Sequence, residues 1–248
     1  MSANRVYGDK IAINTKQVEE FYNKRAAMAN EKGWEAISLG SEDPTIATRV
    51  YNYDHDVLFP KLNVDSNTRV LEIGCGMGRW ASIILPHCGY YCGADFSEEM
   101  IHVANSICHD YEKRCDFYHL SAVESVEKGP EYFGGLFGSI LFSGVCIYIN
   151  DSEMKQIFDN LADLCAGNCT ICVRETVAFT ERLTLNVFMS EALNSTYNAI
   201  YRTQEQYNKF FEPLLKAGFK IVEQEFLPES VGRKRAETNG WYTILKKG

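Results

Sequence analysis

The sequence predicts an α/β fold, in which a mostly parallel sheet carries helices on both faces. Short apolar runs, such as Val70–Ile73 and Gly138–Ser143, suit strands that are buried on both sides. Amphipathic helical patterns stand between such runs, for example from Asp151 to about Cys165. Strands that alternate with helices along a chain are typical of this class.

The composition is that of an ordinary folded domain. The 248 residues fit one large domain, or one domain with an appended helical piece. The net charge of -8 argues against nucleic acid as the main partner, because phosphate backbones select basic surfaces. No apolar run approaches the ~20 residues that span a bilayer, and the N-terminus lacks the apolar core of a signal peptide. We therefore expect a cytoplasmic protein with no membrane partner.

The cysteines and histidines do not suggest a metal site. The nine cysteines and five histidines are dispersed along the chain. Cys169 and Cys172 form a C-x-x-C, but within a strand their side chains would point to opposite faces. We expect reduced thiols and no metal, as in a cytosolic protein.

Residues 1–64 are expected to form an N-terminal helical cap. Residues 1 to about 14 have the pattern of a loosely docked start, and a helix is expected from Thr15 as its N-cap. A second helix is expected within Ala47–Leu62, broken near Pro60. These helices could cover a ligand cleft or could serve packing alone, and the sequence leaves both readings open.

The stretch Val70–Trp80 reads as a buried strand, a glycine-rich turn and the start of a helix at roughly Met77–His87. The turn holds Gly74, Gly76 and Gly78. Glycines let the backbone turn sharply and approach a ligand, because no Cβ intervenes. The helix would point its unpaired N–H groups at a nucleotide-like molecule over the turn. The dinucleotide fingerprint G-x-G-x-x-G would need glycine where Arg79 stands.

A second strand, Tyr90–Asp95, ends in an acid 21 positions beyond Gly74. At that spacing a carboxylate can reach a ribose diol and accept charge-assisted hydrogen bonds from it. Phe96 could lie against an adenine face. Ser97 is expected to cap a helix that carries Met100 in its first turns.

Two motifs, Glu72-x-Gly74-x-Gly76-x-Gly78 and Asp95-Phe-Ser-x-x-Met100, together resemble the first two motifs of the class I S-adenosylmethionine-dependent methyltransferases. The resemblance covers roughly residues 65–247. It implies a Rossmann-like, seven-stranded sheet whose last strand is antiparallel, in a domain at 65–248 with a lid-like insertion at about 176–202. It also implies S-adenosyl-L-methionine as cofactor, with S-adenosyl-L-homocysteine as product.

The resemblance further implies a set of cofactor contacts at the ends of the first four strands. These are Glu72, Gly74, Cys75, Gly76, Arg79, Trp80, Asp95, Phe96, Met100, Ser121, Ala122, Val123, Phe142, Ser143 and Gly144. The family often has Asp where this chain has Ser121, and a hydroxyl is a weaker acceptor for the adenine amino group. After the fourth strand the chain has Phe-Ser-Gly-Val instead of Asn/Asp-Pro-Pro-aromatic, which disfavours an adenine or glutamine amide nitrogen as methyl acceptor.

The remaining elements complete the expected sheet. A third strand is expected at Asp116–Ser121 and a fifth at Cys169–Glu175. Thr203 is expected to cap a helix that runs to Lys216. The last two strands are expected at Lys220–Phe226 and Trp241–Lys247.

Three stretches are similar to small bacterial methyltransferases of capsule and surface-sugar gene clusters, some of which are thought to serve phosphoramidate decoration. They are Val18–Ala26, Gly74–Trp80 and Ile200–Tyr207. The similarity implies methyl transfer to an O or N atom of a small polar or anionic metabolite, such as a sugar or phosphoryl intermediate of capsular polysaccharide biosynthesis.

Candidate contacts for the methyl acceptor are Tyr22, Arg25, Tyr148, Arg174, Tyr201 and Arg202. The planar guanidinium of arginine suits phosphate or carboxylate, and Arg182 could add a further cation. Tyr148 could instead pack in the core, and Tyr201 could pack beside a solvated Arg202.

No catalytic residue is assigned from the sequence. A hydroxyl acceptor would need a general base within hydrogen-bond reach. His119, Glu124 and Glu175 lie near expected strand ends, but the sequence does not select among them.

Two other classes of protein remain open. An NAD-binding oxidoreductase is disfavoured by Arg79 in place of the third glycine. A catalytically inactive methyltransferase-like partner subunit is disfavoured by the intact Glu72, Gly74 and Asp95. The sequence also leaves a homodimer open.

Overall fold

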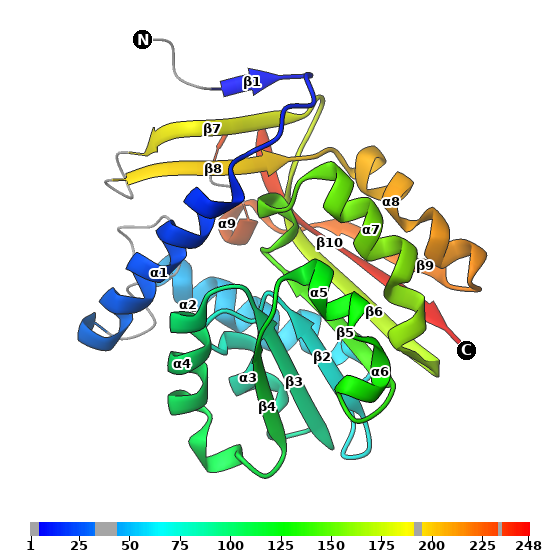
Figure 1. Ribbon diagram of the computed structural model, residues 1–248. Coiled ribbons are helices and arrows are strands. Elements are labelled where there is room, and N and C mark those ends of the chain that lie inside the picture. Colours follow the sequence, from blue (N-terminus) through cyan, green and yellow to red (C-terminus); the bar gives the residue numbers. More distant parts are fainter. Residues whose placement is uncertain (1–4, 33–43, 191–194, 233–234) are drawn as a thin grey trace.

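The structure is a computed structural model that describes residues 5–32, 44–190, 195–232 and 235–248. Within these ranges the centre is a seven-stranded sheet in the order β4-β3-β2-β5-β6-β10-β9 (Figure 1). Its strands are β2 (Arg69–Ile73), β3 (Tyr90–Asp95), β4 (Cys115–His119), β5 (Phe137–Ser143), β6 (Cys165–Ala178), β9 (Lys220–Phe226) and β10 (Thr238–Lys247). Strands β2 to β6 pair in parallel, whereas β10 is antiparallel to both of its neighbours. The predicted fold class is confirmed.

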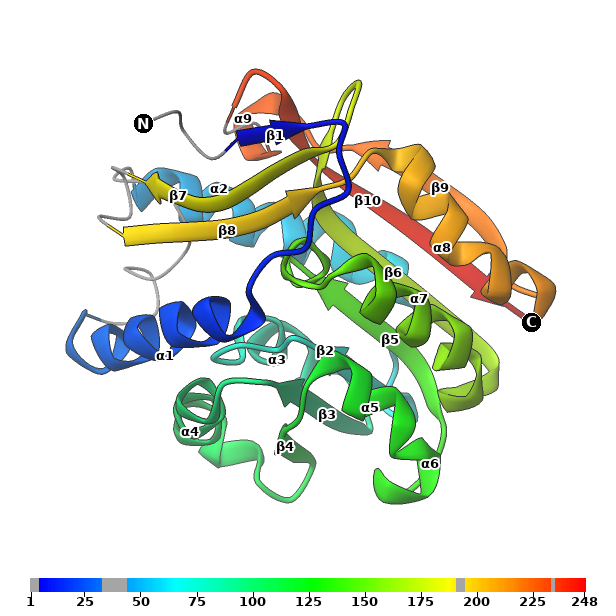
Figure 2. The ribbon, with the colours of Figure 1, turned by 45° about the horizontal axis from the view of Figure 1, so that its top comes forward.

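Helices pack on both faces of this sheet, so each face has its own apolar core. One face is covered by α5 (Ala122–Glu127), α7 (Asp151–Asn160) and α8 (Gln204–Lys216), over a core that includes Phe142 and Phe158 (Figures 1 and 2). The second core packs α3 with two short helical turns. These are α3 (Arg79–Ile84), the π-helical turn η2 (Asp54–Leu58) and the 3-10 turn η3 (Phe59–Leu62).

The other helical elements are short, apart from two near the N-terminus. They are α1 (Thr15–Lys32), α2 (Pro44–Tyr53), α4 (Glu98–Ile107), η4 (His109–Tyr111), α6 (Gly129–Tyr132), η5 (Cys146–Tyr148), η6 (Leu161–Leu164) and α9 (Glu229–Gly232). None of the helices within the described ranges is long and apolar enough to cross a membrane.

The order of the strands places a ligand crevice beside β2. The chain lays β3 and β4 on one side of β2 and then returns to place β5 on the other side. In open α/β sheets, ligands bind outside the carboxyl ends of the strands at such a reversal. The loops that follow β2, β3, β5 and β6 are therefore expected to surround a bound ligand.

A second, three-stranded sheet lies above the carboxyl ends of the large sheet (Figures 1 and 2). It consists of β1 (Arg5–Tyr7), β7 (Leu183–Ser190) and β8 (Ser195–Tyr201), in the order β1-β7-β8 and antiparallel throughout. The expected lid-like insertion thus contains a β-hairpin. The expectation of a loosely docked start is wrong for residues 5–7, because β1 pairs with β7 in this sheet; residues 1–4 lie outside the described ranges.

Several element boundaries differ from the sequence expectation by one or a few residues. The N-cap of α1 is Asn14 and not Thr15, because Asn14 Oδ1 accepts hydrogen bonds from the backbone N–H groups of Lys16 and Gln17. For α7 the sequence pattern predicts Asp151 as N-cap, but the N-cap is Asn150, one residue earlier. The predicted N-cap at Thr203 is confirmed, since its hydroxyl accepts from the N–H of Gln206 at 3.3 Å.

Candidate active site

The glycine turn after β2 is closed on one side and open on the other. Gly74 and Gly76 both have positive φ angles, of 79° and 53°. A Cβ on Gly74 would overlap the side chain of Val145, whereas one on Gly76 would meet nothing within 4 Å. The turn therefore packs against the loop after β5 through Gly74 and leaves space for a ligand above Gly76.

Asp95, at the carboxyl end of β3, is held beside this turn. Its Oδ2 accepts from the N–H of Gly76 and its Oδ1 from the N–H of Ser97, both at 2.9 Å. Burial raises the pKa of Asp95 to about 6, although those two N–H groups oppose the shift. Each carboxylate oxygen keeps a second lone pair, so Asp95 can still accept from two hydroxyls of a ligand.

A cavity of about 330 Å³ opens over Asp95. This volume lies within the range of small-molecule sites. Its lining comes from α1, the ends of β2, β3 and β4, the loop after β5, and the first turns of α5 and α7. The lining residues are Thr15, Lys16, Glu19, Gly74, Asp95, Phe96, His119, Leu120, Ser121, Ala122, Val123, Glu124, Val145, Tyr148, Ile149 and Glu153.

The end of the cavity beyond Phe96 is built by the start of α5. Ser121 caps this helix, with its Oγ accepting from the N–H of Glu124 at 3.2 Å. The carboxylate of Glu124 accepts in return from the N–H of Ser121 at 2.8 Å, which holds the pKa of Glu124 below its usual value. The side chain of Glu124 is thus engaged in a capping box. His119 is fixed by a 3.0 Å hydrogen bond between its Nε2 and the carbonyl oxygen of Phe96.

A cluster of aromatic residues, Tyr22, Phe96 and Tyr148, lies against the cavity on the side of α1. The ring of Tyr22 makes edge contacts with Tyr148 and Phe96, at centroid distances of 5.2 and 6.3 Å. The hydroxyls of Tyr148 and Tyr197 are 2.7 Å apart. Burial raises the pKa of Tyr22 and of Tyr148 well above the usual range, so both phenols are neutral.

Comparisons with known proteins identify a domain within the chain and the fold. A family model described as a methyltransferase domain matches residues 71–171. These residues are a methyltransferase domain. The prediction of a class I methyltransferase is confirmed at the level of domain and fold. No curated protein sequence matches the chain.

Solved structures share the fold of this methyltransferase at low identity. One is the 1,6-didemethyltoxoflavin-N1-methyltransferase of Burkholderia thailandensis, with its substrate and S-adenosylhomocysteine bound: 13% identity, TM-score 0.66, 100% of this chain and 97% of that chain. Another is the magnesium protoporphyrin IX methyltransferase of Synechocystis PCC 6803, with bound S-adenosylmethionine. It is 14% identical with a TM-score of 0.63, and the match covers 97% of this chain and 100% of that chain. A third is phosphoethanolamine N-methyltransferase 1 of Haemonchus contortus. It is 15% identical with a TM-score of 0.67, and the match covers 95% of this chain and 50% of that chain.

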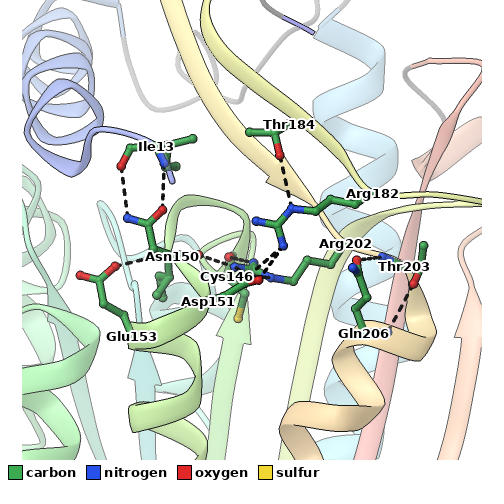
Figure 3. Close-up of polar contacts among 11 residues, drawn as sticks. Ile13, Cys146, Asn150, Asp151, Glu153, Arg182, Thr184, Arg202, Thr203 and Gln206 are labelled. Atoms are coloured by element: carbon green, nitrogen blue, oxygen red, sulfur yellow. Dashed lines mark hydrogen bonds and ion pairs between the residues drawn. The ribbon is translucent and has the colours of Figure 1, made fainter. Parts of the chain in front are cut away.

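The wall of the methyltransferase cavity is tied to the three-stranded sheet by one acid, Asp151 (Figure 3). Asp151 accepts from Arg182 NH1 at 2.8 and 2.9 Å and from Arg202 Nε and NH2 at 2.8 and 2.6 Å. Arg202 also donates to the carbonyl oxygens of Cys146 and Ile149. Burial alone would raise the pKa of Asp151, but the two arginines outweigh it and hold that pKa below its usual value.

This network corrects two of the expected acceptor contacts. Arg202 is 0% exposed and its donors are used by Asp151 and by backbone carbonyls, so it supports the loop instead of meeting a substrate. Tyr201 is 2% exposed, and its hydroxyl accepts from Arg235 NH1 at 2.9 Å. The further cation, Arg182, is also buried against Asp151. The positions of Arg182 and Arg202 along the chain do not show that both pair with Asp151.

A second charged cluster lies on the β5 side of the glycine turn. Arg79 and Arg174 both pair with the buried Asp54, at 2.6 and 3.1 Å. Ser143 Oγ accepts from Trp80 Nε1 at 2.9 Å. The structure thus brings together four of the expected contacts, Arg79, Trp80, Ser143 and Arg174, with an acid that the sequence did not indicate.

Other expected cofactor contacts do not reach the cavity. Glu72 is 2% exposed and accepts a hydrogen bond from the hydroxyl of Tyr91, and burial raises its pKa to about 8, so it is mainly protonated at neutral pH. The ring of Phe142 stacks on Phe158 in the core, at a centroid distance of 5.6 Å. These side chains build the strands below the site.

The remaining expected positions fall into three groups. Gly74, Asp95, Phe96, Ser121, Ala122, Val123 and Tyr148 line the cavity. Cys75 and Met100 are buried, at 4% and 3% exposure, and Gly144 continues the loop after β5 with a φ of 72°. Tyr22 and Arg25 lie on α1, where the Arg25 guanidinium is 5.4 Å from the centroid of the Phe21 ring.

Sequence reasoning missed the part of the lining that α1 supplies. Thr15, Lys16 and Glu19 reach the cavity from the first turns of α1. The signal for them was the polar face of a helix whose apolar side carries Val18 and Phe21, which are buried.

Proposed function

We propose that this methyltransferase transfers the methyl group of S-adenosyl-L-methionine to an O or N atom of a small polar metabolite. The observation that carries the proposal is the position of Asp95 on the floor of the cavity, beside the open face of Gly76. A carboxylate with spare lone pairs suits a ribose diol, and a glycine without neighbours above it suits a ligand that lies against the backbone.

The cavity lining also suits the charge of the proposed donor. Besides Asp95, the acidic residues Glu19, Glu124 and Glu153 line the cavity, against one lysine, Lys16. A sulfonium cation is attracted by such a surface. The adenine end would lie near Ser121 and the backbone of Ala122 and Val123, and the methionine end would lie along the glycine turn toward Ser143.

The chemistry asks little of individual side chains beyond positioning. A sulfonium donor is already activated, so the protein needs to align acceptor, methyl group and sulfur and to keep water out. Such alignment can lower a barrier by up to about 7–11 kcal/mol. The aromatic group of Tyr22, Tyr148 and Phe96 would exclude water beside the reacting atoms.

Neither Glu124 nor Glu175 is placed to act as a catalytic base at the cavity. Glu124 is engaged with the N–H of Ser121, and Glu175 accepts from the N–H groups of Val145 and Cys146 at 2.8 and 2.7 Å. Those hydrogen bonds hold the pKa of Glu124 below its usual value, which weakens it as a base. Burial outweighs them at Glu175 and raises its pKa to about 7, but Glu175 is 1% exposed and is not among the residues that line the cavity. An acceptor that loses its proton readily, or loses it to solvent, fits the cavity best.

The chemical class of the methyl acceptor is the more specific part of the proposal. A sugar or phosphoryl compound, as in capsule biosynthesis, rests on the resemblance of three short stretches of sequence, and so does action in the cytoplasm. Methylation assays should compare nucleotide sugars and phosphoramidates with phenols and peptides. Methylation of a phenol or a peptide alone would exclude the sugar and phosphoryl classes.

Calorimetry tests the donor directly. We expect S-adenosylhomocysteine to bind and NAD not to bind, which separates the methyltransferase from an oxidoreductase. Asp95→Asn should weaken binding at least tenfold, because the amide presents only one acceptor oxygen to the diol. Asp116→Asn is the matched control, since Asp116 accepts from the Tyr90 and Tyr118 hydroxyls at an exposed position outside the cavity lining. Equal affinities for both variants would contradict the proposed site.

A further inference from the structure

Two arginines converge on one buried acid at the carboxyl ends of the central strands. Asp54, the first residue of the turn η2, is 0% exposed. Its Oδ2 accepts from Arg79 NH1 at 2.6 Å, and its Oδ1 accepts from Arg174 Nε at 3.1 Å. Arg79 follows the glycine turn after β2, and Arg174 lies within β6, opposite Ser143, the last residue of β5. A π-helical turn is rare and often marks a functional position.

The cluster carries an excess positive charge. Two guanidinium groups share one carboxylate, so one unit of charge remains. Glu72, the nearby acid under the turn, keeps its proton at neutral pH. Glu175 follows Arg174 along β6 and therefore points to the opposite face of the sheet, and Glu223 is paired with Lys61 at 2.7 Å.

The arginines also have hydrogen-bond donors to spare. Arg174 binds Asp54 through Nε, and its two terminal amino groups have no hydrogen-bond partner within the described ranges. Arg79 uses NH1 for Asp54 and approaches Ser143 Oγ with NH2 at 3.4 Å. The side chains of Arg79 and Arg174 remain 27% and 16% exposed, so an incoming group can reach them. Planar forks of N–H donors match carboxylate and phosphate oxygens.

The position of the cluster relates it to the acceptor. Ser143 pairs with Arg174 across β5 and β6, and the N–H of Gly144 donates to the carbonyl oxygen of Arg174 at 2.9 Å. The cofactor cavity extends from β4 to the loop after β5, so the cluster lies on the other side of the reversal in strand order. A molecule bound there would face the end of the cavity at which the methyl group is expected.

We propose that Arg79 and Arg174, aligned by Asp54, bind an anionic phosphate or carboxylate group of the methyl acceptor. The proposal rests on the proposed function and narrows its substrate class. The same guanidinium groups could instead hold the carboxylate of the cofactor's methionine end, and the experiment below separates the two sources.

The test is a titration of the protein, saturated with S-adenosylhomocysteine, with inorganic phosphate, followed by calorimetry and thermal unfolding. We expect saturable binding to the wild-type protein and at least a tenfold loss in Arg174→Gln, with the affinity for S-adenosylhomocysteine unchanged within about twofold. Arg114→Gln is the control, because Arg114 is exposed and donates to the carbonyl oxygen of Cys88, away from this cluster. Asp54→Asn/Arg174→Gln removes one charge of each sign and serves if the single variant does not fold.

Three outcomes would overturn the proposal. The first is equal phosphate binding by wild type and Arg174→Gln. The second is a loss of affinity for S-adenosylhomocysteine in Arg174→Gln without a loss for 5′-methylthioadenosine, which lacks the amino-acid end; this would assign the site to the cofactor. The third is a wild-type protein that binds S-adenosylhomocysteine but no phosphate. Failure of the wild type to bind S-adenosylhomocysteine would instead overturn the proposed function.

Discussion

Asn150 and Ile13, which lie 137 positions apart, exchange two hydrogen bonds (Figure 3). The N–H of Ile13 donates to Asn150 Oδ1 at 2.9 Å, and Asn150 Nδ2 donates to the carbonyl oxygen of Ile13 at 3.1 Å. Asn150 stands between Ile149 and Glu153 in the cavity wall, and Ile13 precedes the residues of α1 that form the roof. One amide side chain therefore ties the roof to the wall.

The first prediction separates these two hydrogen bonds. Asn150→Asp keeps an acceptor for the N–H of Ile13 and for the capping position of α7, but it loses the donor to the Ile13 carbonyl. We expect the Kd of S-adenosylhomocysteine to rise about 2–10-fold, since a hydrogen bond contributes about 0.5–1.5 kcal/mol. Calorimetry measures the Kd. The control is Asn67→Asp in the exposed loop before β2, and an equal change there would exclude a specific role for the Asn150–Ile13 pair.

The second prediction concerns Asp151. Asp151→Asn would leave two buried guanidinium groups without their counterion, and loss of one partner of a buried pair costs about 3–5 kcal/mol. We expect about 3 kcal/mol, the low end of that range, because the side chain of Asp151 keeps 29% exposure. Asp159→Asn on the same helix breaks an exposed pair with Lys155 and should change stability by less than about 0.5 kcal/mol. Urea unfolding measures the free energy of unfolding of both variants. Similar decreases in Asp151→Asn and Asp159→Asn would contradict the role of Asp151 as the counterion of two buried arginines.

The third prediction compares two glycines of one turn. Gly74→Ala combines a positive φ with overlap against Val145, so its free energy of unfolding should fall by about 2–5 kcal/mol. Gly76→Ala has only the positive φ and should lose about 1–2 kcal/mol. Its new methyl group would enter the space assigned to the cofactor, so its affinity for S-adenosylhomocysteine should fall at least tenfold. A folded Gly76→Ala protein that binds S-adenosylhomocysteine with unchanged affinity would show that the cofactor does not lie against the turn.

The fourth prediction is a pH dependence that arises from Glu72. Burial raises its pKa to about 8 in the folded protein, above the 4.5 of a free glutamate. Between these values the folded state binds more protons than the unfolded state, so stability falls as pH rises from about 4.5 to 8. One proton accounts for up to about 1.4 kcal/mol per pH unit. Glu72→Gln should reduce this slope, to which Asp95 and Glu175 also contribute through pKa values raised to about 6 and about 7. Glu212→Gln at an exposed site should keep the slope. An unchanged slope in Glu72→Gln would mean that Glu72 is ionised.

The sequence predicted the parts of the site that depend on local pattern. The bounds of β3 and the place of Asp95 followed from a short apolar run that ends in an acid, and the structure has them at Tyr90–Asp95. The glycine turn was recognisable because three glycines at alternate positions serve few other purposes. The hairpin β7–β8 was expected only as a lid, because an insertion of that length carries little information about strand pairing.

The parts that were missed depend on contacts between distant positions. Strand β1 has three residues, too few for a periodic pattern, and its partner β7 lies far along the chain. Arg202 was expected to meet a substrate, but its partner Asp151 is 51 positions away and buries it. Asp54 gave no signal at all, since a lone acid in a helical stretch is usually solvated.

The pairing of β1 with β7 has a consequence for how the protein is made. Arg5 lies opposite Leu185, so β1 waits for about 180 further residues to be synthesised before it meets its partner. By then β2 to β6 have emerged, and parallel pairing among them does not require the N-terminal strand. Contacts between such distant positions form late in folding. The strands below the cofactor cavity can therefore pair on the nascent chain before the three-stranded sheet above it, which forms only after β7 and β8 have been synthesised.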